Sequence, residues 1–323
     1  MRERSMRHLV PICLCLALAA CGGDFSNDDL EFLNAFPRRE DLTASMPGKT
    51  QGEAWGARVA SKSAQQAGRL GDSSGIVGDT DKTGLRFNEA VDGILSSLEA
   101  IQQYTPTKRE PNRRVWGPIP GRNDMRFDTR FVMTREGERF DYQLQYRDIG
   151  EGEDAWWSFM SGSFQANGGV RKGEGSLIMD LKRAREERFL DIPFLDREEI
   201  HYQTRKLPTR VELVFVSNVP TLLPSRYIYR EAEGDLAEMT FQILDTDFVQ
   251  GGLREDVALT TRWAPDGRGT GILEIIKGDI LGAKYTECWD AQGRVTFISR
   301  SWDFLNPTEG LRSSCPDMSA LDR

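Results

Sequence analysis

The residues best suited to chemistry lie in one acidic and aromatic stretch, Glu151-Gly152-Glu153-Asp154-Ala155-Trp156-Trp157. Paired carboxylates can supply the acid and the base of glycoside hydrolysis, and tryptophan rings can stack on a sugar. The candidate catalytic acids are Glu151, Glu153 and Asp154, and the candidate ligand-binding residues are Trp156 and Trp157. Catalytic carboxylates need rigid support, however, and a glycine-containing turn does not provide it. We favour a solvated acidic turn followed by a strand.

A second pattern, Gly71-Asp72-Ser73-Ser74-Gly75, matches the G-x-S-x-G signature of serine hydrolases. That signature requires a buried strand before the serine and a histidine to accept its proton. A polar stretch precedes the pattern here, and the chain has only two histidines, His8 and His201. We therefore expect 71–75 to belong to a loop and His201 to lie on a half-exposed strand without a catalytic role.

Metal and cofactor sites are not predicted. Asp79-Thr80-Asp81-Lys82-Thr83-Gly84 begins like a calcium loop, but Ala90 stands at the twelfth position, where a glutamate is needed. Helix capping by Asp81 or Thr83 is the favoured alternative. A single histidine in the exported chain and two widely spaced cysteines do not suit zinc. The glycine-rich stretch 167–175 lacks the G-K-[ST] ending of a phosphate loop, which favours a hairpin loop.

The N-terminus has the organisation of an export signal, with a basic start and an apolar run from Leu9 to Ala20. The run is shorter than the roughly 20 residues that span a bilayer. Leu18-Ala19-Ala20-Cys21 resembles the lipobox of bacterial lipoproteins. The resemblance covers residues 1–21 and implies diacylation of Cys21 and cleavage before it. Because Gly22 rather than aspartate follows, it also implies the outer membrane, on either its periplasmic or its surface face.

Charge and cysteines narrow the choice of partners. The 323 residues carry a formal net charge of −8, which argues against nucleic acid and against electrostatic binding to anionic lipid. Membrane attachment would then depend on the acyl chains. Once Cys13, Cys15 and Cys21 are assigned to the signal and the lipid, Cys288 and Cys315 remain. We expect them to form a disulfide, with two separate thiols as the alternative.

One amphipathic helix is predicted over 85–104. Its apolar face is formed by Phe87, Val91, Ile94, Leu95, Leu98 and Ile101. We expect residues 1–20 to be the signal, 21–84 to contain a short helix and a polar linker, and 85–323 to form a β-rich domain. A flexible linker of this length has a reach of about 40–45 Å, so the domain could stand off the membrane.

Strands are predicted from about Met125 to Trp302. Phe140, Tyr142, Leu144 and Tyr146 alternate with polar residues, which indicates one buried and one solvated face. Short turns separate successive apolar-alternating segments, a pattern typical of hairpins. The predicted fold is therefore mainly β: a large antiparallel meander, curved into a half-barrel or a closed barrel, with the helix packed on it.

At the level of fold, a curved sheet under one helix resembles the periplasmic lipid-handling lipoproteins of the half-barrel type. We expect a non-enzymatic, membrane-anchored module that binds an apolar ligand or an envelope partner protein. The alternative is a hydrolase of envelope glycans that uses Glu151, Glu153 and Asp154. Their positions distinguish the two, because the hydrolase needs them to converge on a cleft lined by Trp156 and Trp157.

Overall fold

The structure is a computed structural model that describes residues 26–46, 68–119, 126–167, 169, 171–219, 226–246 and 252–322. The expected signal (1–20), the expected lipidation residue Cys21 and residues 47–67 of the expected linker lie outside the described residues. Within the described ranges, no helix has both the length and the apolar character needed to cross a bilayer.

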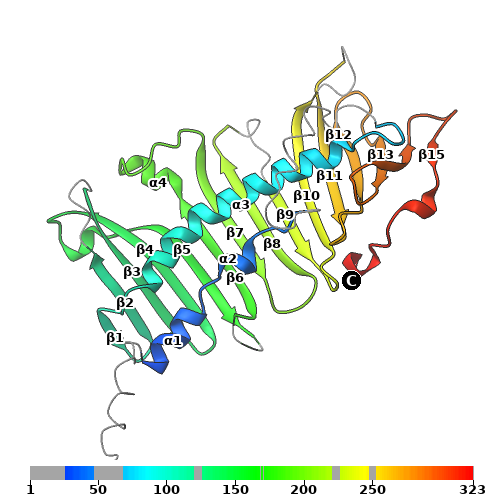
Figure 1. Cartoon of the computed structure of the whole chain (residues 1–323). Coiled ribbons are helices and arrows are strands. Elements are labelled where there is room, and N and C mark those ends of the chain that lie inside the picture. Colours follow the sequence, from blue (N-terminus) through cyan, green and yellow to red (C-terminus); the bar gives the residue numbers. More distant parts are fainter. Residues whose placement is uncertain are drawn as a thin grey trace, which may run out of the picture.

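One antiparallel sheet, to which the described residues contribute fifteen strands, dominates the molecule (Figure 1). Each strand pairs with its neighbours in sequence, so the predicted meander is confirmed. The sheet is open, with β1 and β15 as its two edges, and the alternative of a closed barrel is therefore wrong. The strands are β1 (Lys108–Glu110), β2 (Arg113–Ile119), β3 (Phe127–Glu136), β4 (Arg139–Asp148), β5 (Trp157–Ala166), β6 (Gly173–Asp180), β7 (Leu195–Gln203), β8 (Thr209–Ser217), β9 (Arg226–Glu231), β10 (Ala237–Thr246), β11 (Glu255–Trp263), β12 (Gly269–Lys277), β13 (Lys284–Trp289), β14 (Val295–Arg300) and β15 (Thr308–Gly310).

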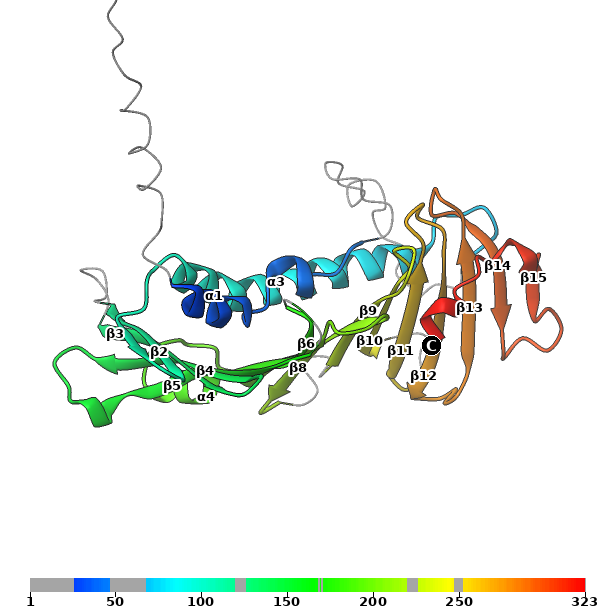
Figure 2. The same ribbon diagram turned by 90° about the horizontal axis from the view of Figure 1, so that it is seen from below.

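The helices are α1 (Asn27–Asn34), α2 (Arg39–Leu42), α3 (Gly75–Gln102) and α4 (Leu181–Glu186). Helices α1, α2 and α3 lie on one face of the sheet, which we call the covered face (Figure 2). The opposite face is called the open face. In Figure 2 the strands at the β2–β8 end are seen nearly edge-on and β11–β14 nearly face-on, so the sheet twists strongly along its length.

Helix α3 crosses the strands from one end of the sheet to the other (Figure 1). At its N-terminus the cap residue Ser74 bonds to Glu287 of β13. Just beyond its C-terminus, the indole of Trp116 on β2 donates to the Tyr104 carbonyl at 2.9 Å. The apolar face predicted for this helix is confirmed, because all six of its side chains are at most 4% exposed.

The start of α3 differs from the expectation of a helix that begins at residue 85. Residues 75–84 are helical, with Ile76, Val77 and Thr80 buried on the same face. Neither Asp81 nor Thr83 caps the helix, because both lie inside it. Glycine, threonine and aspartate give this segment a low intrinsic helix propensity, and packing on the sheet outweighs it.

Helices α1 and α2 pack on the sheet, and α1 is the short helix expected within residues 21–84. Phe32, Phe36 and Leu42 are at most 1% exposed. Phe36 contacts the rings of Phe131 on β3 and Tyr142 on β4, with ring centres 5.2 and 5.9 Å away. The described residues from Ser26 to Leu42 are thus part of the folded domain.

Aromatic rings lie over glycines on neighbouring strands of the covered face. A Cβ on Gly162 would come within 2.3 Å of the Tyr142 ring and 2.4 Å of the Ser176 carbonyl oxygen. A Cβ on Gly175 would meet the Tyr202 ring at 2.3 Å. These glycines let the rings lie flat on the sheet, an arrangement known to stabilise glycine-containing antiparallel strands. The rings of Tyr142 and Tyr202 therefore occupy the space that a side chain at Gly162 or Gly175 would need.

The predicted disulfide between Cys288 and Cys315 is confirmed. Cys288 follows Glu287 on β13, and because Glu287 faces Ser74 on the covered face, Cys288 faces the open one. The bond holds the C-terminal tail against this part of the sheet, and the tail ends with Met318 and Leu321 packed against Ala232. The open face is therefore partly covered near β13.

Candidate functional site

The three candidate acids lie on an exposed turn between β4 and β5. Glu151 and Asp154 are exposed, and the Glu153 side chain is 78% exposed and bonds to Arg130 at 2.7 Å. That guanidinium lowers the pKa of Glu153. A general acid needs a raised pKa. Glu151, Glu153 and Asp154 therefore do not converge on a cleft, as the hydrolase alternative requires.

The two candidate tryptophans lie on opposite sides of the sheet. The ring of Trp156 stacks against the guanidinium groups of Arg130 and Arg147, whose central carbons are 4.3 and 4.5 Å from the ring centre. Both arginines are on the open face. Trp157 instead joins the aromatic core of the covered face, 5.7 Å from Tyr146 and 6.0 Å from Phe189. The pair therefore does not form a single stacking platform.

The G-x-S-x-G pattern forms the start of α3 and not a loop or a nucleophile turn. The Ser74 hydroxyl accepts from the Val77 amide at 3.1 Å and donates to Glu287. Tyr285 donates to the same carboxylate at 2.7 Å. Burial raises the pKa of Glu287, and the Ser74 and Tyr285 hydroxyls oppose this effect. The cluster anchors the helix, and the catalytic histidine that the signature requires is absent from it.

His201 lies on β7, six strands away from β13. Its Nε2 is 2.8 Å from Glu199, which also binds Arg197 at 2.5 Å. The expectation that His201 lies on a half-exposed strand is confirmed, with 45% of its side chain exposed. Within the described ranges, no three histidine, cysteine or acidic side chains lie close enough together to hold a metal ion. Residues 79–84, which begin like a calcium loop, are helical.

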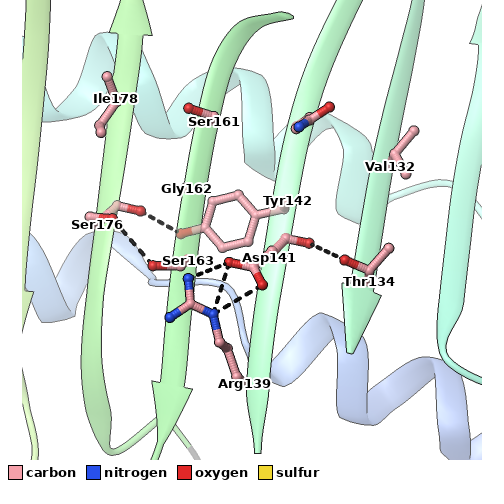
Figure 3. Close-up of a pocket in the computed structure, with 11 residues that line it drawn as sticks. Val132, Thr134, Arg139, Asp141, Tyr142, Ser161, Gly162, Ser163, Ser176 and Ile178 are labelled. Carbon is pink, nitrogen blue, oxygen red and sulfur yellow. Dashed lines mark hydrogen bonds and ion pairs between the residues drawn. The ribbon is translucent and has the colours of Figure 1, made fainter. Parts of the chain in front are cut away.

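The open face contains a shallow depression of about 460 Å³ over β3–β6 (Figure 3). Ser161, Ser163 and Ser176 lie at its centre, and their small side chains create the hollow. The Arg139–Asp141 ion pair, with contacts of 2.7–3.1 Å, stands at its rim. The depression can donate and accept hydrogen bonds, but its acid is neutralised by its arginine.

A second depression of about 570 Å³ adjoins the first across β6. His201 is paired in register with Ser176, so the two hollows lie side by side on neighbouring strands. Arg210 and Arg226 both bind Glu212 here. Together the two depressions make a broad surface of mixed polar and apolar lining, in which the ion pairs Arg139–Asp141 and Arg210–Glu212 neutralise part of the charge.

Glu198 is a buried acid that sequence reasoning missed. It lies on β7 and is 7% exposed, and its register partners on the neighbouring strands are Met179 and Phe215. Its Oε1 has no hydrogen-bond partner among the described residues. Burial raises its pKa to about 7. The sequence does contain evidence for this burial, because Glu198 occupies an inward-facing position in the alternation of apolar and polar residues along β7.

Exposed apolar side chains at loop tips were also missed. Leu253, Leu281, Phe304 and Leu305 are 68–91% exposed. They occupy three loops at the same end of β10–β14, since alternate connections of an antiparallel meander lie at one end. Asp303 accepts from the Leu305 amide at 3.1 Å and so fixes the turn that presents Phe304 and Leu305. Local sequence patterns do not distinguish such loop leucines from core residues.

Searches against protein-family models, curated proteins and solved structures find no match to this chain.

Proposed function

We propose that the chain is a lipid-anchored, non-enzymatic binding module of the cell envelope, and that it uses the open face of its sheet to hold a partner protein. The observation that carries the proposal is the open face itself, which is solvated and lined by pre-paired polar side chains and two adjoining hollows. Ordered, mutually neutralised polar side chains suit a protein interface, because little side-chain entropy remains to be lost on binding.

An apolar ligand is the less favoured occupant. The space between α3 and the sheet is filled by the helix's own side chains, because Phe87, Val91 and Leu98 are all at most 1% exposed. The two depressions described above are lined by both polar and apolar atoms and are open to solvent, so neither is an apolar cavity. An apolar ligand beneath α3 would have to displace part of the core. The hydrolase alternative has no supporting observation, since Glu151, Glu153 and Asp154 do not converge.

Anchoring to the outer membrane remains part of the proposal and depends on Cys21 and Gly22. The first test is the location of a Cys21→Ser variant in cells. The variant should lose lipid labelling and leave the membrane fraction. If the unprocessed variant sediments with membranes as the natural chain does, the anchor is contradicted.

Binding through the open face is tested by photo-crosslinking in cells. A photoreactive residue at Gln143 or Ser161 should give one discrete cross-linked product. The matched controls are Glu89 and Ser96, which are exposed on α3 on the opposite side of the sheet. Equal products at all four positions, or none on the open face, would contradict the proposal. One bound lipid per purified chain would favour the apolar ligand instead.

A further inference from the structure

The position of Ser26 restricts how the molecule can meet a membrane. Ser26 caps α1, and its amide donates to the Asp29 carboxylate at 3.0 Å while its hydroxyl accepts from the Asp29 amide at 3.1 Å. Asp29 is fully buried and binds Arg109 at 3.0 Å and Arg114 at 2.6 Å. Ser26 is therefore fixed to the β1–β2 hairpin at one edge of the sheet.

The chain between this fixed point and the proposed lipid is short. Four residues lie between Cys21 and Ser26, and a fully extended chain covers about 17 Å from one to the other. A flat sheet of this many strands, spaced at about 4.8 Å, would measure about 70 Å across. The tether is thus much shorter than the molecule, whatever conformation it adopts.

We infer that the edge formed by α1 and β1 rests on the lipid surface to which Cys21 is attached. The inference depends on the proposed acylation of Cys21. Leu30 of α1 is 47% exposed at this edge and supplies an apolar contact. The β14–β15 loop, which carries Phe304, belongs to the opposite edge of the sheet.

The charges of this edge indicate that acylation, rather than electrostatic attraction, brings it to the lipid. Its arginines are paired with acids of the same edge: Arg113 with Glu110, Arg135 with Glu31, and Arg109 and Arg114 with Asp28 and Asp29. Exposed Lys108 is the remaining cation of β1, and an edge with so small a net charge gains little from anionic headgroups. Contact should accordingly persist at high salt, since only screened charge interactions weaken there.

The test uses the acylated, processed chain, which has lost Cys13 and Cys15 with the signal, in phosphatidylcholine vesicles that carry a headgroup-bound fluorescence quencher. A fluorophore is placed on a new cysteine at one of three positions, with the variants Leu30→Cys, Lys108→Cys and Phe304→Cys. The acylated Cys21 and the disulfide-bonded Cys288 and Cys315 do not react. Positions 30 and 108 should lose most of their fluorescence and position 304 little, at low and at high salt.

The matched control inserts 40 glycine and serine residues between Gly23 and Asp24, which gives a mean reach of about 35 Å. With this insertion, quenching at positions 30 and 108 should fall to the level at position 304. Equal quenching at all three positions without the insertion, unchanged quenching with it, or loss of quenching at high salt would overturn the inference. If the chain does not bind vesicles at all, the acyl anchor itself is contradicted, and the inference fails with it.

Discussion

At the scale of single residues, Glu198 shows how the fold changes the chemistry of a side chain. Burial on the covered face raises its pKa from 4.5 to about 7, so the folded chain holds a proton that the unfolded chain releases. An acid with a raised pKa stabilises the fold fully below the unfolded value and loses this effect as the pH rises through the folded value. The free energy of unfolding should therefore fall by up to about 3 kcal/mol between pH 4.5 and just above 7.

The variant Glu198→Gln tests this prediction. It cannot ionise, so its free energy of unfolding, measured by urea denaturation across this pH range, should lose most of that slope. Above pH 7 it should be more stable than the natural chain. Glu199→Gln is the matched control on the adjacent position, where burial raises the pKa of the carboxyl but the hydrogen bonds from His201 and Arg197 together lower it below its ordinary value. That control should lose stability above the unfolded pKa of Glu199, and the same response from both variants would contradict the assignment.

Residue positions within the candidate site followed only in part from the sequence. The exposure of the Glu151–Asp154 turn was predicted, because glycine and clustered acids favour solvent. The stacking of Trp156 on Arg130 and Arg147 was not, because it depends on strand register. The Asp29–Arg114 pair joins residues 85 positions apart. Neither interaction leaves a local pattern.

At the scale of elements, the N-terminus of α3 depends on Ser74. Its hydroxyl satisfies the Val77 amide and donates to the buried Glu287. In Ser74→Ala, loss of the cap costs about 1 kcal/mol and loss of a buried carboxylate's donor about 1–3 kcal/mol more. Ser96→Ala is the control on the same helix, because its exposed hydroxyl bonds only to the Asp92 carbonyl among the described residues. Thermal unfolding should show a large loss for Ser74→Ala and almost none for Ser96→Ala.

The pairing of Tyr142 with Gly162 makes a second prediction about the elements. In Gly162→Ala the new Cβ would meet the Tyr142 ring at 2.3 Å and a backbone oxygen at 2.4 Å. Such overpacking costs about 1–3 kcal/mol. Ser161→Ala, on the adjacent position and the open face, is the matched control and should change the free energy of unfolding by much less. If urea denaturation gives equal losses, the ring does not need the glycine.

The strands and the main helix were largely predictable, because the alternation of apolar and polar residues that defines each of them lies within a short stretch of sequence. The hairpin β3–β4, with Glu136 opposite Arg139, follows from alternation and one glycine turn. The first ten residues of α3 were missed because their helicity comes from contacts with β12 and β13 and not from their own propensity. For example, a Cβ on Gly271 would lie 2.7 Å from Ile76. Non-local packing of this kind has no signature within a short window.

At the scale of the whole molecule, α3 connects parts of the sheet that no strand connects. Each strand of the meander pairs only with its sequence neighbours, as the units of a repeat protein do, and such arrays tend to unfold in segments. Helix α3 alone among the described helices reaches from the neighbourhood of β2 to that of β13. We therefore expect it to couple the two ends of the sheet into one cooperative unit.

Gly93 allows that coupling to be tested, because it lies near the middle of α3 with nothing within 4 Å of its missing Cβ. Gly93→Pro removes a helical hydrogen bond and bends or breaks the helix, at about 3 kcal/mol or more. Gly93→Ala should stabilise the same helix by about 0.5–1 kcal/mol. If α3 couples the ends of the sheet, guanidinium denaturation should show one transition for Gly93→Ala and two for Gly93→Pro. Hydrogen exchange should then become faster at one end of the sheet than at the other. A single, merely shifted transition in the proline variant would show that the sheet is cooperative without the helix.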